Sequence, residues 1–70
     1  MNAGDLPEYS RIRVKDLKIR GVFSEEVNFY YLEGDKAYCQ NDKGHETYLE
    51  LDTPVEYLCT MKEYINNLNQ

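Results

Sequence analysis

The sequence is poor in the residue types on which most catalytic and metal sites depend. Its 70 residues include no tryptophan, one histidine and two cysteines. A single histidine, His45, provides no basis for a histidine-containing metal cluster or a cysteine–histidine nucleophile. The chain also lacks a glycine-rich loop that could cradle phosphate. We therefore expect a protein that is not an enzyme and that holds no metal or cofactor.

Long hydrophobic runs are also missing. The longest unbroken apolar segment, Phe29 to Leu32, is far too short for a membrane-spanning helix or the core of a signal peptide. Cys39 and Cys59 are widely spaced, which argues against a disulfide framework and is typical of a reducing compartment. The sequence thus predicts a soluble cytoplasmic protein whose two thiols are buried and unreactive. A core this small gives modest stability, and homodimer formation is one source of further burial.

Basic residues are scarce beyond the first third of the chain. The formal net charge is −5, and it divides into +2 for residues 1–24 and −7 for residues 25–70. Such an acidic surface repels phosphate backbones, so a basic protein is a more plausible partner than nucleic acid. Direct nucleic-acid binding would depend on four N-terminal bases: Arg11, Arg13, Lys18 and Arg20.

Alternating polar and apolar residues predict a small antiparallel sheet of about four strands. Residues 1–10, which Gly4 and Pro7 interrupt, are expected to form a flexible tail. Residues 11–70 would then form one β-β-β-β-α domain of the α+β class, with the strands arranged as a meander. A slip in the alternation near Lys15 and Asp16 indicates a bulge or bend in the first strand. The predicted strands cover residues 11–20, 27–33, 36–41 and 45–51.

A helix is predicted from Pro54 to Asn67. Thr53 is a suitable N-cap, Pro54 is favoured at the first helical position, and Glu56 completes a capping box. A stripe of apolar residues at helical spacing should pack on one face of the sheet. This stripe consists of Val55, Leu58, Met61, Ile65 and Leu68.

Two turns predict the strand register. Gly34-Asp35 suits a two-residue hairpin loop that pairs Tyr31 with Tyr38. Asp42-Lys43-Gly44 suits a type I turn with a glycine bulge, which pairs Tyr38 with Tyr48. One face of the sheet should then carry the core residues Tyr30, Leu32, Ala37, Cys39, Thr47, Leu49 and Leu51. The other should carry a row of Tyr31, Tyr38 and Tyr48, flanked by Phe29, Glu33, Lys36, Gln40, Glu46 and Glu50.

This row of tyrosines has two interpretations. The first strand of a small barrel could fold across it, bury the rings and place Arg11, Arg13 or Arg20 against Glu46 and Glu50. Alternatively, the rings are exposed and bind a partner or a second copy of the chain, since tyrosine combines apolar area with a hydroxyl that can remain hydrated.

The acidic residues suggest a function. Carboxylates spaced along the elements can imitate the charge of a phosphate backbone and occupy the basic groove of a DNA-binding protein. The candidate residues are Glu25, Glu26, Glu33, Asp35, Asp42, Glu46, Glu50, Asp52, Glu56 and Glu63. In size, acidity and tyrosine content the chain resembles small bacteriophage host-takeover proteins, some of which mimic DNA. That resemblance covers the whole chain without a diagnostic motif, and it implies a basic bacterial target such as a histone-like nucleoid protein.

A second hypothesis gives the tyrosines the main role. In this interpretation the chain is an adaptor or antitoxin-like module that recognises a folded protein through Tyr31, Tyr38 and Tyr48, and its charge serves solubility. The two hypotheses predict opposite sensitivities, because charge-based binding weakens with salt whereas aromatic anchors tolerate it.

Overall fold

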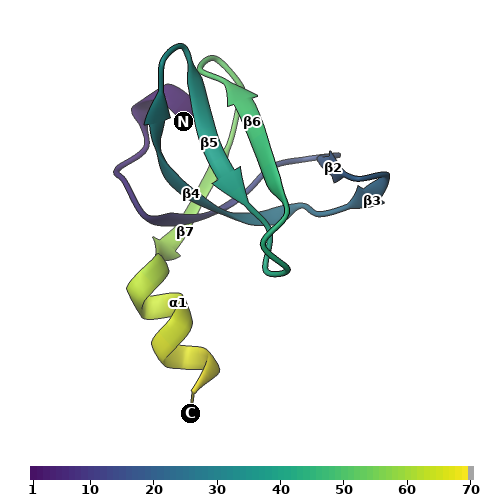
Figure 1. The fold of residues 1–70 in the computed structure, drawn as a ribbon. Helices are drawn as coiled ribbons and strands as arrows, with labels where there is room; N and C mark the ends of the chain where they lie inside the picture. Colours follow the sequence, from purple (N-terminus) through teal and green to yellow (C-terminus); the bar gives the residue numbers. More distant parts are fainter. Residues whose placement is uncertain (70) are drawn as a thin grey trace.

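The computed structural model describes residues 1–69 and has an α+β architecture (Figure 1). Five antiparallel strands form an open sheet in the order β6-β5-β4-β1-β7, and β2 and β3 form a separate hairpin. The predicted class, the antiparallel sheet and the C-terminal helix are confirmed, with five strands in the main sheet rather than about four. The elements are η1 (Ala3–Asp5), β1 (Ser10–Arg13), β2 (Lys18–Ile19), β3 (Val22–Phe23), β4 (Glu26–Glu33), β5 (Lys36–Gln40), β6 (Glu46–Glu50), β7 (Glu56–Thr60) and α1 (Met61–Leu68).

Both predicted hairpin registers are confirmed. Tyr31 pairs with Tyr38, and Tyr38 pairs with Tyr48. Gly34 has a φ of 61°, and a positive φ at the first loop residue is typical of a type II′ turn. Gly44 has a φ of 82° and closes the second turn as a glycine bulge. Local turn chemistry therefore fixes the three strands that carry the tyrosine row.

The first predicted strand is two elements. β1 ends at Arg13, and the predicted bend near Lys15 and Asp16 is a turn in which Asp16 has a φ of 61°. The chain then forms the β2–β3 hairpin, whose connecting residues Arg20 and Gly21 both have positive φ, 54° and 79°. Two successive positive φ values suit the type I′ turns that join short antiparallel strands. In Figure 1 this hairpin extends away from the main sheet.

A bulge in β4 exchanges the predicted places of two aromatic residues. Phe29 pairs with Cys39 and Tyr31 pairs with Tyr38, so Tyr30 is the extra residue between two regular pairs. Phe29 consequently faces the core and is fully buried, whereas Tyr30 lies with the other tyrosines. The prediction that Tyr30 faces the core and Phe29 the tyrosine row is wrong for this reason. Leu32, also predicted in the core, is 45% exposed at the end of its hairpin.

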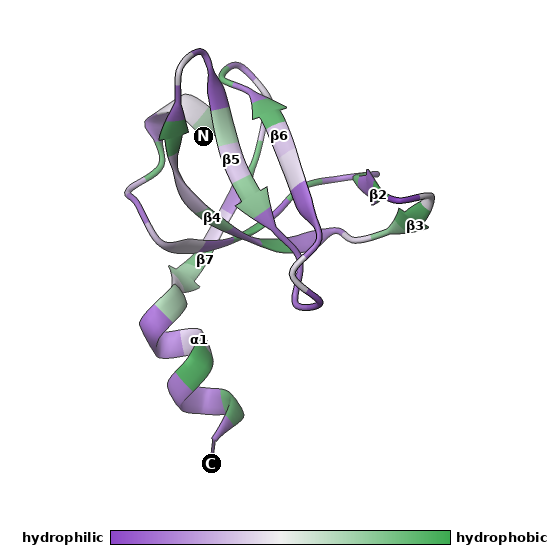
Figure 2. Cartoon of the chain, in the orientation of Figure 1, coloured by the Kyte–Doolittle hydropathy of each residue, from purple (hydrophilic) through white to green (hydrophobic). Residues whose placement is uncertain are grey.

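The predicted helix over Pro54–Asn67 begins seven residues too early. Glu56–Thr60 instead form β7, which pairs with β1, and α1 starts at Met61. A second capping box, Thr60 with Glu63, marks the true start: the Glu63 N–H donates to Thr60 Oγ1 (3.0 Å), and the Thr60 N–H donates to Glu63 Oε1 (3.1 Å). None of the α1 residues is buried, although hydrophobic residues recur along the helix (Figure 2). Among residues 1–69, no helix has the length and apolar character needed to cross a membrane.

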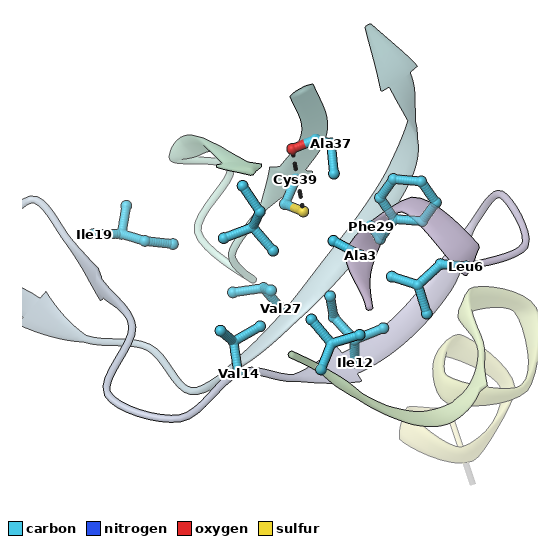
Figure 3. Close-up of a cluster of buried hydrophobic side chains, with 11 residues drawn as sticks. Ala3, Leu6, Ile12, Val14, Ile19, Val27, Phe29, Ala37 and Cys39 are labelled. Carbon is cyan, nitrogen blue, oxygen red and sulfur yellow. Dashed lines mark hydrogen bonds between the residues drawn. The ribbon is translucent and has the colours of Figure 1, made fainter. Parts of the chain in front are cut away.

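The predicted packing of the helix on one face of the sheet is therefore wrong, and the core contains no residue of α1 (Figure 3). The N-terminal segment, expected as a flexible tail, contributes Ala3 and Leu6 to it, and the Ala3 N–H donates to the Thr53 carbonyl (2.9 Å). Burial of these side chains stabilises the fold in proportion to the apolar area removed from water. The core residues are Ala3, Leu6, Ile12, Val14, Ile19, Val27, Phe29, Ala37, Cys39, Leu49 and Val55.

Candidate protein-binding surface

Five tyrosines form a continuous aromatic surface on the outer face of the sheet, which we call the tyrosine cluster. Tyr38 is its centre: its ring centroid lies 5.7 Å from that of Tyr30, 5.2 Å from Tyr31 and 5.4 Å from Tyr48. Tyr9 joins through Tyr30 at 6.1 Å. These separations are those of favourable aromatic pairs. The first strand does not cover the cluster, because β1 lies beside β4 in the same sheet.

The cluster is only partly exposed. Tyr38 is 7% exposed because its neighbours surround it, whereas Tyr48 is 50% and Tyr31 36% exposed. One buried ring in the middle with accessible rings around it resembles the anchor of a protein interface, where aromatic residues contribute most of the binding energy. Of the two sequence interpretations, the geometry therefore favours the exposed one.

Hydrogen bonds link the tyrosine hydroxyls to two carboxylates. The Tyr38 hydroxyl donates to Glu46 Oε2, and the Tyr48 hydroxyl donates to Glu33 Oε2 (3.3 Å). Gln40 holds Tyr38 from the other side, because its Nε2 donates to the Tyr38 hydroxyl oxygen (2.6 Å). Glu33 and Glu46 are thereby fixed at the margin of the rings as acceptors.

These contacts keep the two hydroxyls protonated. The hydrogen bond to Glu46 raises the pKa of Tyr38, because a phenolate beside a carboxylate is unfavourable. Burial, followed by the charge of Glu33, raises the pKa of Tyr48. Both hydroxyls, whose ordinary pKa of 10.0 already keeps them protonated at neutral pH, therefore remain donors to Glu46 and Glu33 at still higher pH.

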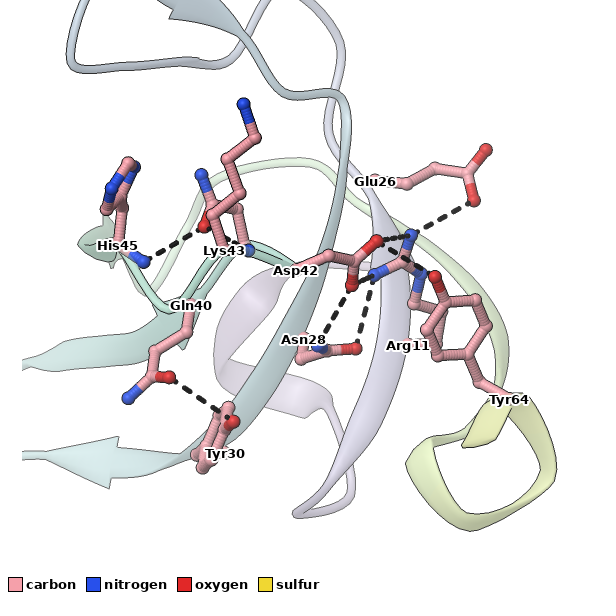
Figure 4. A network of polar contacts seen from close by, with 10 residues as sticks. Arg11, Glu26, Asn28, Tyr30, Gln40, Asp42, Lys43, His45 and Tyr64 are labelled. Atoms are coloured by element: carbon pink, nitrogen blue, oxygen red, sulfur yellow. Dashed lines mark hydrogen bonds and ion pairs between the residues drawn. The ribbon is translucent and has the colours of Figure 1, made fainter. Parts of the chain in front are cut away.

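The other half of the same face is organised around Arg11, which is only 5% exposed (Figure 4). Its guanidinium donates to both oxygens of Asp42, at 2.8 and 3.3 Å, and to Asn28 Oδ1 at 3.3 Å. The Glu26 carboxylate lies 3.6 Å away, and the Tyr64 ring centroid lies 4.0 Å from the guanidinium carbon. We call Arg11, Glu26, Asn28, Asp42 and Tyr64 the arginine network.

The arginine network holds Asp42 in its charged form. Burial alone would raise the pKa of Asp42, but hydrogen bonds from the Tyr64 hydroxyl (2.8 Å) and the Arg11 guanidinium outweigh it. The pKa of Asp42 consequently lies below its ordinary value of 3.8. The network also attaches α1 to the sheet, since Tyr64 is its contribution from the helix.

The ten candidate carboxylates are therefore not equivalent. Glu26 and Asp42 pair with Arg11, Glu56 pairs with Arg13, and Glu50 pairs with Lys36. Glu63 caps α1. In the part of the chain that the structure describes, five carboxylates have no ion-pair partner: Glu25, Glu33, Asp35, Glu46 and Asp52. Of these, only Glu33 and Glu46 contact the tyrosine cluster.

The ion pairs predicted between the first strand and the tyrosine face are wrong. Arg11 and Arg13 pair with Glu26, Asp42 and Glu56 instead of Glu46 and Glu50. The four bases considered for nucleic-acid binding are also divided between two elements: Arg11 and Arg13 lie on β1, and Lys18 and Arg20 lie on the β2–β3 hairpin. Lys18 lies over the Phe23 ring at 4.7 Å on that hairpin.

A cleft of about 460 Å³ separates the β2–β3 hairpin from the β5–β6 turn. Its wall combines the exposed ring of Phe23 with Arg20 and Lys43. Glu26 and Asp42 also line it, and these acids offset the basic residues. The cleft is thus less distinctly charged than the tyrosine cluster.

The remaining sequence candidates do not assemble into a reactive site. Burial raises the pKa of the Cys39 thiol to about 12, which keeps it protonated, as predicted for a core cysteine. Cys59 lies half-buried on β7 and not on the predicted helix. No group of histidine, cysteine, aspartate and glutamate side chains within residues 1–69 is arranged to hold a metal ion.

Sequence reasoning located the centre of the site and missed its extension. Tyr31, Tyr38 and Tyr48 lie together as predicted. Tyr9 was assigned to the tail, but its N–H donates to the Tyr30 carbonyl (3.0 Å), which brings both rings into the cluster. No protein-family model, curated protein or solved structure matches the chain. Its function is therefore inferred from its own residues.

Proposed function

We propose that the chain is a non-enzymatic acidic inhibitor that binds the nucleic-acid-binding surface of a basic bacterial protein. The position of Glu33 and Glu46 beside the tyrosine cluster supports this proposal. Neither has an ion-pair partner within residues 1–69, and both are held by tyrosine hydroxyls. A lysine or arginine of the partner would be stabilised in two ways at such a site, because the carboxylates attract its charge and the aromatic rings accept a cation over their faces.

The same attraction explains how binding would inhibit. A surface that neutralises phosphates also attracts carboxylates, so the chain and DNA compete for it. The net charge of −5 adds long-range attraction toward such a surface. The target type is a histone-like nucleoid protein, and the setting is the cytoplasm of a bacterial host, as for bacteriophage proteins that take over host functions.

The test is capture of partners from a bacterial lysate on the immobilised chain at low salt, followed by elution with duplex DNA and mass spectrometry. We expect DNA-binding proteins to be released by the duplex. The double variant Glu33→Gln/Glu46→Gln should lower this capture about tenfold, whereas the matched control Glu26→Gln/Glu56→Gln, which removes the same charge from paired sites, should change it less than twofold. Equal losses for the two variants would refute a role for the tyrosine face.

A second candidate function follows from the aromatic surface itself. With Tyr31 and Tyr48 accessible around a buried Tyr38, the cluster also suits an adaptor or antitoxin-like module for a folded protein without a basic groove. Such a partner would remain bound in high salt and in excess duplex DNA. Its recovery in place of DNA-binding proteins would replace the first proposal with the second.

A further inference from the structure

We infer that the partner adds a β-strand to the open edge of β6, and that this strand carries basic residues at alternate positions. The inference rests on the proposed function and specifies how the partner docks. β6 is the last strand of the sheet order, and no strand within residues 1–69 pairs with its outer edge. An unpaired edge presents a row of backbone donors and acceptors to any extended chain.

The phase of hydrogen bonding identifies which groups of β6 are available. The Asn41 N–H donates to the His45 carbonyl (3.0 Å), so His45 bonds toward β5. Backbone groups in an antiparallel strand alternate in direction, and the β5–β6 register has no shift. Thr47 and Leu49 therefore also bond toward β5, while the N–H and C=O groups of Glu46 and Tyr48 point to the open edge.

The side chains at this edge define the partner. Glu46, Tyr48 and Glu50 all lie on the tyrosine face, at the first, third and fifth positions of the strand. A second copy of the chain pairing antiparallel over the full strand would place Glu46 opposite Glu50 twice, and directly opposed like charges are destabilising. A strand with lysine or arginine at its first and fifth positions would instead place one base opposite Glu46, which has no ion-pair partner within residues 1–69, and the other opposite Glu50, which already pairs with Lys36. Charge complementarity at Glu46 thus favours a basic strand over a second copy of the chain.

The other edge of the sheet is less suited to this role. β7 is bracketed by the bridge between Asn2 and Pro54 at one end and by α1 at the other. Its pairing with β1 also contains a register shift next to Arg11. Irregular and covered edges resist strand addition, so the regular five residues of β6 are the better template.

The experiment uses a labelled peptide containing Lys-Val-Tyr-Val-Lys, titrated with the full chain and followed by fluorescence anisotropy at low salt. One derivative carries N-methyl groups on the tyrosine and the second lysine, whose N–H groups would face Tyr48 and Glu46. The first lysine is left unmodified, because the Glu50 carbonyl opposite it already accepts from the Thr53 N–H (3.0 Å). The control derivative carries N-methyl groups on the two valines, which would point away. We expect the first to bind at least about tenfold more weakly than the second, since only it loses inter-strand hydrogen bonds.

Amide hydrogen exchange supplies an independent measurement. The peptide should slow exchange at Glu46 and Tyr48, while Thr47 and Leu49, already bonded to β5, should change little. Equal affinity of the two methylated peptides, or protection at Glu46 and Tyr48 by self-association without peptide, would overturn strand addition by a basic partner. If no peptide binds while duplex-sensitive capture from lysate persists, the inference fails and the proposed function survives. If capture is also absent, both fail.

Discussion

The two halves of the outer sheet face both combine tyrosines with carboxylates but, in the described part of the chain, the carboxylates are ion-paired in one half and without a cation in the other. In the arginine network, Glu26 and Asp42 form ion pairs with the buried Arg11 guanidinium, and Glu26 also pairs with Arg13. In the tyrosine cluster, Glu33 and Glu46 accept hydrogen bonds from tyrosine hydroxyls and have no ion-pair partner within residues 1–69. The difference teaches that formal charge alone does not identify a binding surface. What matters is which carboxylates the fold leaves without a cation.

Removing the guanidinium should have the largest effect. Arg11→Met leaves Asp42, Glu26 and Asn28 without their shared donor, and we expect a loss of about 2 kcal/mol in the free energy of unfolding. The matched variant Arg13→Met breaks ion pairs whose side chains are all about half-exposed, so its loss should be far smaller than that of Arg11→Met. Urea denaturation of the two variants measures the contrast. Similar losses in the free energy of unfolding would show that the burial of Arg11 does not make its contacts more stabilising than those of Arg13.

Truncating one aromatic ring should have the next largest effect, and on binding rather than stability. Tyr48→Ala removes an accessible ring of the tyrosine cluster, so capture of the partner should fall about tenfold, equivalent to about 1.4 kcal/mol. Tyr64→Ala, the equivalent truncation in the arginine network, should leave capture within about twofold once folding is verified by circular dichroism. The reverse ranking would place the binding surface on the other half of the face.

The smallest expected effect is the pH dependence of the stability difference between Asp42→Asn and the parent chain. Because the pKa of Asp42 is lowered in the folded state, its carboxylate stabilises the fold above the unfolded pKa near 3.8, and this contribution disappears as the pH falls through the lower folded value. The variant Asp42→Asn should therefore be less stable than the parent at pH 7 by less than about 1 kcal/mol, and the difference should shrink below about pH 4. Denaturation curves at pH 7, 4 and 3 measure this trend. A difference that grows in acid would contradict the assignment.

The turn residues of the sequence correctly predicted the pairing of β4, β5 and β6. Gly34 and Gly44 fix two hairpins through backbone conformations that other residues rarely adopt, so the register of Tyr31, Tyr38 and Tyr48 followed from sequence. The start of the helix was wrong because the threonine–glutamate spacing of a capping box occurs at Thr53 as well as at Thr60. Pairing with β1, a contact distant in sequence, selects the second.

The parts of the site that sequence reasoning missed depend on tertiary structure. The bulge at Tyr30 leaves no trace in an alternating pattern, and Tyr9 joins the cluster through a backbone hydrogen bond and a ring contact to Tyr30. Likewise, the residues adjacent to Arg11 in sequence do not reveal that it neutralises Asp42, which is 31 positions away. The row of tyrosines was predictable, but the division of the carboxylates into paired and unpaired groups was not.

The helix α1 continues directly from strand β7, so the two elements are rigidly connected. No linker separates Thr60 from Met61, and the Met61 N–H donates to the Tyr9 carbonyl (2.8 Å) at the border of the tyrosine cluster. Hinges usually consist of a few loop or terminal residues that absorb rotation, and this junction has no loop to absorb it. Because the Tyr64 hydroxyl also donates to Asp42 (2.8 Å), α1 is held to the sheet at a second point, and a probe attached to the helix would report the orientation of the whole sheet.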